Sequence, residues 1–233
     1  MPPFVTSIIR FYRSSIGKKI IVALTGAALI LFLIGHMLGN LLVFAGPETL
    51  NAYAKKLQDL GPLLWAARIG LLVAVGLHIV ATVQLTVANR AARAQAYGVD
   101  VTRKATKASR TMIWSGTIIL LFVIYHLMHF TWGVANGYYD KENARYWLPN
   151  GDHNVYNMVV DGFSWAPASI FYIVAMGLLF QHLSHGFASV FQTLGLTTPK
   201  SRPLIEMGGR VVALVLFAGN ALMPLAVLFG AVK

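Results

Sequence analysis

Four histidines lie in the middle of long apolar stretches of this sequence, where lipid or protein would surround them instead of water. They are His36, His78, His126 and His182. An ionisable side chain at that depth is costly and is by default a functional residue. Neutral imidazole is also a common metal ligand. The chain has no cysteine, so disulfides, thiolate-bound zinc and iron–sulfur clusters held by this chain are excluded.

The stretches that hold these histidines are long enough to cross a bilayer. The chain is 57% apolar and only 12% charged, whereas soluble domains carry about 25% charged residues. Apolar runs of roughly the 20 residues that a bilayer requires recur five times, at about residues 20–44, 63–87, 112–133, 166–190 and 208–232. The sequence predicts an all-α membrane bundle of five transmembrane helices, forming a single domain over residues 1–233.

The loop charges predict the orientation of this bundle. Thirteen of the 19 Lys and Arg residues lie in the N-terminal segment, residues 88–110 and residues 191–210, and six of the eight Asp and Glu residues lie in the other two loops. Basic loops stay in the cytoplasm, so the N-terminus is predicted to be cytoplasmic and the chain to be a multi-pass protein of the cell inner membrane. The net charge of +11 is then a sign of topology, and nucleic acid is not expected as a partner.

Position along each span gives the depth of each histidine at about 1.5 Å per residue. His36 and His126 fall on the outer side of the midplane, and His78 and His182 fall on the cytoplasmic side. The two layers are predicted to be roughly 10 Å apart. Two bis-histidine sites stacked across a bilayer fit two b-type haems. With both axial positions filled, the expected chemistry is one-electron transfer.

Other sites fit this pattern less well. Zinc and di-iron sites usually include carboxylates or thiolates, and no Asp or Glu lies inside a predicted span. A proton-coupled transporter would more often have intramembrane carboxylates and broken helices. His129 and His185 each follow a proposed ligand by three residues and are alternative ligands or neighbours of the haem periphery. A hydrogen bond to water, a propionate or a headgroup is the better interpretation of both.

A short pattern of small residues occurs twice. Thr25-Gly26 precedes His36 by eleven and ten residues, and Ser115-Gly116 precedes His126 by the same intervals. A porphyrin needs small residues where it meets a helix, so Gly26 and Gly116 are predicted to pack against haem.

Four segments resemble a known family. SSIGKK (14–19), LTGAALILFLIGHMLGNLLVFAGPE (24–48), SGTIILLFVIYHLMHF (115–130) and FYIVAMGLLFQHLSHG (171–186) are similar to the five-helix, di-haem cytochrome b anchor of succinate:quinone oxidoreductases, the family of succinate dehydrogenases and fumarate reductases. The resemblance covers nearly the whole chain. It is weaker in the second span, where LLVAVGLHIVATVQL supplies only the histidine at the matching place.

The resemblance implies a set of ligands and partners. His36 and His126 would hold the distal haem, and His78 and His182 the proximal haem. A flavoprotein and an iron–sulfur subunit would dock on the cytoplasmic face, and electrons would pass to menaquinone or ubiquinone. No succinate chemistry is implied for this chain itself, which would be the quinone-reacting membrane subunit. Some fumarate reductases of the family have a glutamate two residues before the fourth ligand, and Phe180 stands there in this chain.

Further candidates are weaker, and catalytic residues are not identified. Lys19 and Arg110 are candidates for contact with haem propionates, and Ser14, Ser15 and Lys18 for contact with quinone. A role in topology or contact with membrane lipid explains all five at least as well. The main alternative function is the di-haem anchor of another quinone-linked enzyme, of the hydrogenase or formate dehydrogenase type. A haem-free transporter or assembly protein is the alternative of another class.

Overall fold

The computed structural model describes residues 2–92, 110–134 and 136–233 of the 233-residue chain. The described part is helical, and its only β-type pairing is an isolated bridge between Trp147 and His153. The five long helices are α2 (Ser15–Asn40), α4 (Pro62–Ala91), α6 (Met112–His126), α8 (Ala166–Thr193) and α9 (Arg202–Leu228). The shorter elements are α1 (Pro3–Arg13), α3 (Pro47–Gln58), α7 (Val155–Ser164), the 3-10 segment η1 (Leu41–Ala45) and the π-helical segment η2 (Leu127–Thr131).

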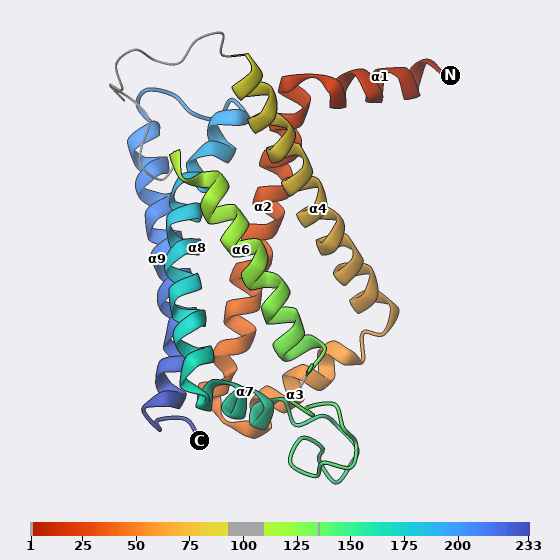
Figure 1. Cartoon of the computed structure of the whole chain (residues 1–233), viewed down its shortest axis with the longest axis vertical. Coiled ribbons are helices and arrows are strands. Elements are labelled where there is room, and N and C mark those ends of the chain that lie inside the picture. Colours follow the sequence, from red (N-terminus) through yellow and green to blue (C-terminus); the bar gives the residue numbers. More distant parts are fainter. Residues whose placement is uncertain (1, 93–109, 135) are drawn as a thin grey trace.

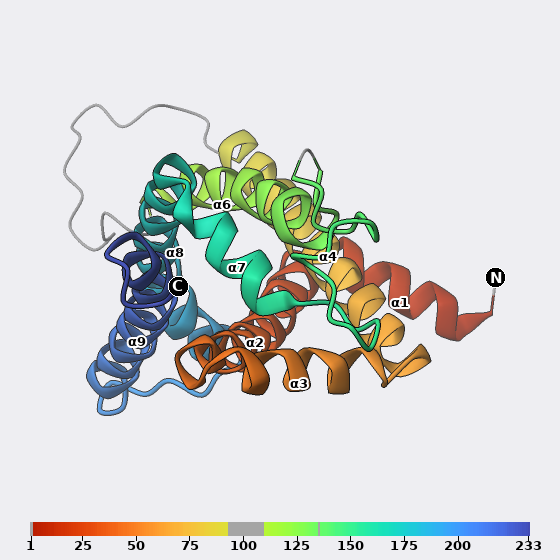
Figure 2. The same ribbon diagram turned by 90° about the horizontal axis from the view of Figure 1, so that it is seen from below.

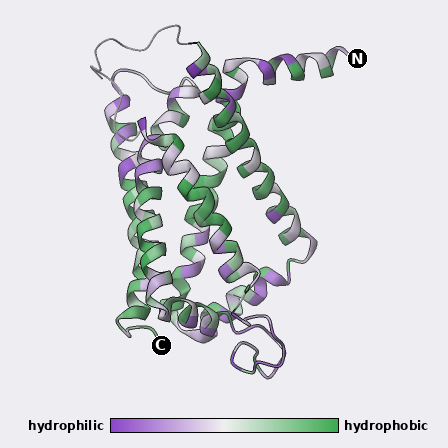
Figure 3. Cartoon of the chain, viewed as in Figure 1, coloured by the Kyte–Doolittle hydropathy of each residue, from purple (hydrophilic) through white to green (hydrophobic). Residues whose placement is uncertain are grey.

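Within the described residues, five helical segments are long and apolar enough to cross a membrane: α2 with η1, α4, α6 with η2, α8 and α9. Their apolar side chains face outward as well as inward, as expected for helices in lipid. Leu31 of α2 is 70% exposed and Leu72 of α4 is 63% exposed. Figure 3 shows hydrophobic residues along the long helices and polar residues at their ends and in the large loop. The all-α, five-helix prediction is confirmed, and the chain is a multi-pass membrane protein.

The helices differ from the predicted spans mainly at their ends. α2 begins five residues before the predicted residue 20, because the Ser14 side chain caps it by accepting a hydrogen bond from the Gly17 amide at 2.9 Å. α9 begins at Arg202 instead of residue 208 and ends at Leu228. Glu206 therefore lies inside a long helix, which corrects the expectation that the spans hold no carboxylate. It pairs with Arg202 at 2.8 Å, one turn earlier.

The long helices run side by side in a bundle that two short helices close at one end (Figures 1 and 2). α2 packs along α4 and α8, α6 packs along α8, and α8 packs most extensively along α9. α1 extends sideways from the other end of the bundle (Figure 1) and buries none of its residues. We refer to these two ends as the α7 end and the α1 end. The polar connection expected after the first span forms α3, which packs against α7.

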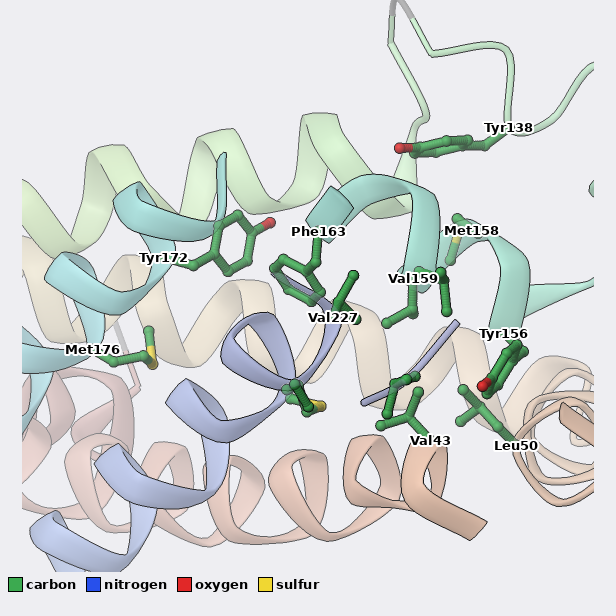
Figure 4. Close-up of a cluster of buried hydrophobic side chains, with 14 of the residues drawn as sticks. Val43, Leu50, Tyr138, Tyr156, Met158, Val159, Phe163, Tyr172, Met176 and Val227 are labelled. Carbon is green, nitrogen blue, oxygen red and sulfur yellow. The ribbon is translucent and has the colours of Figure 1, made fainter. Parts of the chain in front are cut away.

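Most of the buried core lies toward the α7 end, where α7 folds under α6, α8 and α9. Its aromatic centre is Tyr172 of α8 and Phe163 of α7, whose ring centroids are 5.0 Å apart. Figure 4 shows these two rings side by side, with Met176 and Val227 nearby. This packing holds the end of α6 against α8, and it fixes the surroundings of His126 and His129.

The loop that precedes α7 is tied to that helix by an ion pair. The Arg145 guanidinium donates two hydrogen bonds to the Asp161 carboxylate, which also accepts a hydrogen bond from the Tyr146 hydroxyl at 2.9 Å. Hydrogen bonding to Arg145 lowers the pKa of Asp161 below its ordinary value of 3.8. The charged form of Asp161 therefore stabilises the folded loop.

Replacing Asp161 with Asn should destabilise this loop in a pH-dependent way. A carboxylate with a lowered folded pKa stabilises the fold above its unfolded pKa, and that stabilisation is lost as the pH falls through the folded pKa. At pH 7, we expect the free energy of unfolding of the wild type to be larger than that of Asp161→Asn by about 1 kcal/mol at most. The difference should disappear as the pH falls below 3.8. Thermal unfolding in detergent across this pH range measures it.

Asp152→Asn is the matched control, because Asp152 lies in the same loop and forms no ion pair within the described residues. A difference between wild type and Asp161→Asn that is equally large at acidic and neutral pH would contradict the electrostatic explanation.

Candidate functional site

The first pair of predicted ligands, His36 of α2 and His126 of α6, meets inside the bundle. Their ring centroids are 5.7 Å apart, with the ring planes at 88°. Each imidazole also contacts a phenylalanine one turn earlier on its own helix, Phe32 for His36 and Phe122 for His126. Because α2 and α6 do not pack closely along their backbones, these side chains span the space between the two helices.

The second pair, His78 of α4 and His182 of α8, lies closer to the α1 end. The two imidazoles are close enough to interact electrostatically. Each ring forms a hydrogen bond with a hydroxyl on another helix: Thr25 Oγ1 is 3.1 Å from His78 Nδ1, and Ser115 Oγ is 3.1 Å from His182 Nδ1. The two histidines are thus held in the same way by residues that the sequence repeat had marked.

The two glycines of that repeat lie against the rings of the second pair. A Cβ atom at Gly26 would be 3.3 Å from His78 Cε1, and one at Gly116 would be 3.5 Å from His182 Cε1. Gly76 and Gly186 have no such neighbour, since nothing lies within 4 Å of a Cβ atom built on either. The repeated small residues therefore allow α2 to approach a histidine of α4, and α6 to approach a histidine of α8.

These contacts also give the spacing of the two pairs along the bundle. Gly26 is level with the second pair, and His36 is ten residues further along α2, which corresponds to about 15 Å. The interval from Gly116 to His126 on α6 is the same. The predicted separation of roughly 10 Å refers to the membrane normal and stays a prediction, since the 15 Å is measured along the helices.

His129 is placed differently from His126, although both approach the same tyrosine. The Tyr172 hydroxyl is 3.2 Å from Nδ1 of His126 and 3.2 Å from Nδ1 of His129. The ring of His129 stacks on Phe130 with centroids 4.1 Å apart, its Nε2 lies 3.2 Å from a Cβ atom built on Gly162, and only 6% of the residue is exposed. His129 is buried beside Tyr172 and Phe130 and does not face His36, so this geometry favours His126 as the ligand.

The weaker candidates lie away from the paired histidines or have other contacts. His185 is half-buried on α8, close enough to Glu206 of α9 for an electrostatic interaction. Ser14 is occupied as the N-cap of α2, since its hydroxyl also donates to the Phe11 carbonyl oxygen at 2.7 Å. The remaining four candidates lie at the α1 end and are exposed, except for Lys18, which is half-buried: Ser15, Lys18, Lys19 and Arg110.

A cavity of about 410 Å³ opens at the α7 end, between the start of α4 and the end of α6. Its lining includes Trp65, Arg68, Phe130 and Tyr139, with the Arg68 guanidinium 5.1 Å from the centre of the Trp65 ring. Phe130 also contacts the rings of His126 and His129. The cavity is therefore on the side of the first pair, at the opposite end of the bundle from Ser14, Ser15 and Lys18.

The donor set fits a haem iron with two axial imidazoles. Among the described residues, no group of three or more His, Cys, Asp or Glu side chains could hold a metal ion. His36 and His126 are close enough that both could bind one metal ion, since their ring centroids are 5.7 Å apart.

Three hydroxyl groups were not predicted from the sequence to be hydrogen-bond partners of the histidines. Thr25 and Ser115 were recognised as part of a repeat but not as partners of His78 and His182, and Tyr172 was not singled out. The identical spacing of the two repeats was the signal that could have identified the first two. Comparison with family models, curated proteins and solved structures finds no match to this chain.

Proposed function

We propose that this chain is the di-haem cytochrome b membrane anchor of a succinate:quinone oxidoreductase. The observation that supports this most is the pairing of four histidines from four long helices: the ring centroids of His36 and His126 are 5.7 Å apart, and His78 and His182 are close enough to interact electrostatically. The two pairs are about 15 Å apart along the bundle. This spacing would give two successive redox sites within the membrane.

The residues of the chain would hold one haem b at each pair. His36 and His126 would be the axial ligands of one group, and His78 and His182 of the other. When bound, haem iron with two imidazole ligands supplies one-electron transfer. The chain would orient the ligand rings through Phe32, Phe122 and the hydroxyl partners described above. Its apolar helices would exclude water from the space between the two sites.

The proposal includes soluble partners and an orientation in the cell inner membrane. A flavoprotein would oxidise succinate, and an iron–sulfur subunit would pass the electrons to this anchor at the cytoplasmic face. That face would be the α1 end, where the basic N-terminal segment and the basic connection between α8 and α9 lie. Residues 93–109 of the third basic segment lie outside the described part of the chain. Menaquinone or ubiquinone would accept the electrons.

Cysteine labelling tests this orientation directly, since the natural chain has no cysteine. Lys200 and Glu142 are both exposed, Lys200 between α8 and α9 and Glu142 in the loop at the α7 end. A membrane-impermeant thiol reagent added to intact cells should label Glu142→Cys, and it should label Lys200→Cys only after the cells are opened. Labelling of Lys200→Cys in intact cells would show that the α1 end faces the outside, and the proposed docking face for the soluble subunits would then be wrong.

Identification of the co-purifying subunits tests the function itself. The chain should be affinity-tagged, extracted in mild detergent, and its companions identified by mass spectrometry. We expect a flavoprotein with covalent or tightly bound flavin and an iron–sulfur subunit, with succinate-dependent reduction of a quinone analogue. Recovery of hydrogenase or formate dehydrogenase subunits would replace the proposal with the alternative anchor. Recovery of a colourless protein would exclude both cytochrome assignments.

A further inference from the structure

The hydroxyl groups beside the second pair have already used their protons on the helix backbone. Thr25 Oγ1 donates to the Ile21 carbonyl oxygen at 2.6 Å, and Ser115 Oγ donates to the Met112 carbonyl oxygen at 3.1 Å. A hydroxyl has one proton and two acceptor lone pairs. With its proton on the backbone, the oxygen that faces each imidazole can accept a hydrogen bond from Nδ1 of His78 or His182. The backbone of Val22 is a further hydrogen-bond partner of the His78 ring.

This direction of hydrogen bonding determines which ring nitrogen is free. A neutral imidazole carries one N–H and one lone pair. With the proton on Nδ1, the lone pair of His78 and of His182 is on Nε2. In the first pair, Tyr172 offers the same acceptor to Nδ1 of His126. Nδ1 of His129 lies at the same distance of 3.2 Å, so the Tyr172 hydroxyl can accept a hydrogen bond from His126 and donate its single proton to His129.

We propose that Thr25, Ser115 and Tyr172 are positioning residues that fix Nε2 as the iron-binding atom of His78, His182 and His126 and that set the reduction potential of each site. This inference rests on the proposed function, because it assumes that the histidines bind haem. Metal-bound histidines characteristically donate their second N–H to an acceptor, which fixes the tautomer and makes the ligand more basic. Here side-chain hydroxyls on neighbouring helices supply that acceptor.

The sign of the effect follows from ligand basicity. An imidazole whose N–H is hydrogen-bonded donates more electron density to the metal, which favours the more highly charged ferric ion. Removing the acceptor therefore favours the ferrous ion and raises the reduction potential. Tyr172 should act on the pair His36–His126 alone, and Ser115 on the pair His78–His182 alone, because each hydroxyl contacts a ligand of only one pair.

Tyr172→Phe tests the first pair in the intact complex. We expect both haems to be retained. At a fixed solution potential, the ferrous-to-ferric ratio of the haem at His36 and His126 should rise about tenfold, which corresponds to a rise in its reduction potential of about 59 mV for a one-electron couple. The other haem should not change. Tyr125→Phe is the matched control, because the Tyr125 ring packs beside Tyr172 while its hydroxyl makes no hydrogen bond with the described residues. Redox titration monitored by visible and electron paramagnetic resonance spectra reports each haem separately.

Ser115→Ala tests the second pair, and Ser115→Thr restores the hydroxyl. In Ser115→Ala, the inference predicts a rise in the reduction potential of the haem at His78 and His182, or selective loss of that haem. Ser115→Thr should restore the wild-type potential and haem content. Unchanged potentials with two haems retained in Ser115→Ala and Tyr172→Phe would overturn the inference while leaving the proposed function intact. Equal defects in Ser115→Ala and Ser115→Thr would also overturn it, because packing alone would then be responsible. Absence of haem from wild type would instead overturn the proposed function.

Discussion

Replacing His126 with alanine is expected to remove one of two haems from the purified complex, whereas replacing His129 with alanine is expected to remove neither. His126 faces His36 across the bundle with ring centroids 5.7 Å apart. His129 has Tyr172 at Nδ1 and Phe130 against its ring, and only 6% of the residue is exposed. It has no second histidine facing it among the described residues.

Haem content per chain, measured with the pyridine haemochrome assay, distinguishes the two variants. The expected ratios relative to wild type are one half for His126→Ala and unity for His129→Ala. The same comparison applies to His182→Ala and His185→Ala, with His182 as the expected ligand. Loss of a haem from His129→Ala together with full haem content in His126→Ala would show that His129, and not His126, is the ligand.

The second large effect is expected from Gly116→Leu. A Cβ atom at this position already touches His182 Cε1 at 3.5 Å, so the rest of a leucine side chain must displace that ring or the group that it binds. Overpacking of this kind costs about 1–3 kcal/mol, and 1.4 kcal/mol corresponds to a roughly tenfold loss of affinity. We therefore expect the haem held by His78 and His182 to be depleted and the other to be retained.

Gly26→Leu should have the same effect from the other side, because its Cβ atom would lie 3.3 Å from His78 Cε1. Gly70→Leu is the matched control, since Gly70 is an exposed glycine of α4 with nothing within 4 Å of a built Cβ atom. Reduced-minus-oxidised spectra of the three variants, normalised to protein, measure the occupancy. Full haem content in Gly116→Leu would show that this glycine has no steric role at the site.

The features that depend on local sequence were predictable. A membrane-crossing helix requires only an unbroken apolar run of sufficient length, so five such helices could be recognised from composition and order. The shared depth of His36 and His126 could also be predicted, because both lie at similar positions on spans that run in the same direction.

The features that depend on packing between helices were not predictable. Which residue of one helix faces a histidine of another depends on rotation and crossing angle, so the roles of Thr25 and Ser115 became visible only in three dimensions. The contact of Tyr172 with two histidines depends in addition on how α7 supports the end of α8. The capping of α2 by Ser14, which sets the start of that helix five residues before the predicted span, was also not predicted.

The haem content of the wild-type protein is the most direct test of the central claim that this chain holds two bis-histidine haems. The tagged complex should be purified in mild detergent, and its pyridine haemochrome and electron paramagnetic resonance spectra should be recorded against a quantified amount of this chain. The two histidine pairs predict two low-spin b haems per chain. One haem or none per chain, or a high-spin haem with an open axial position, would contradict the claim.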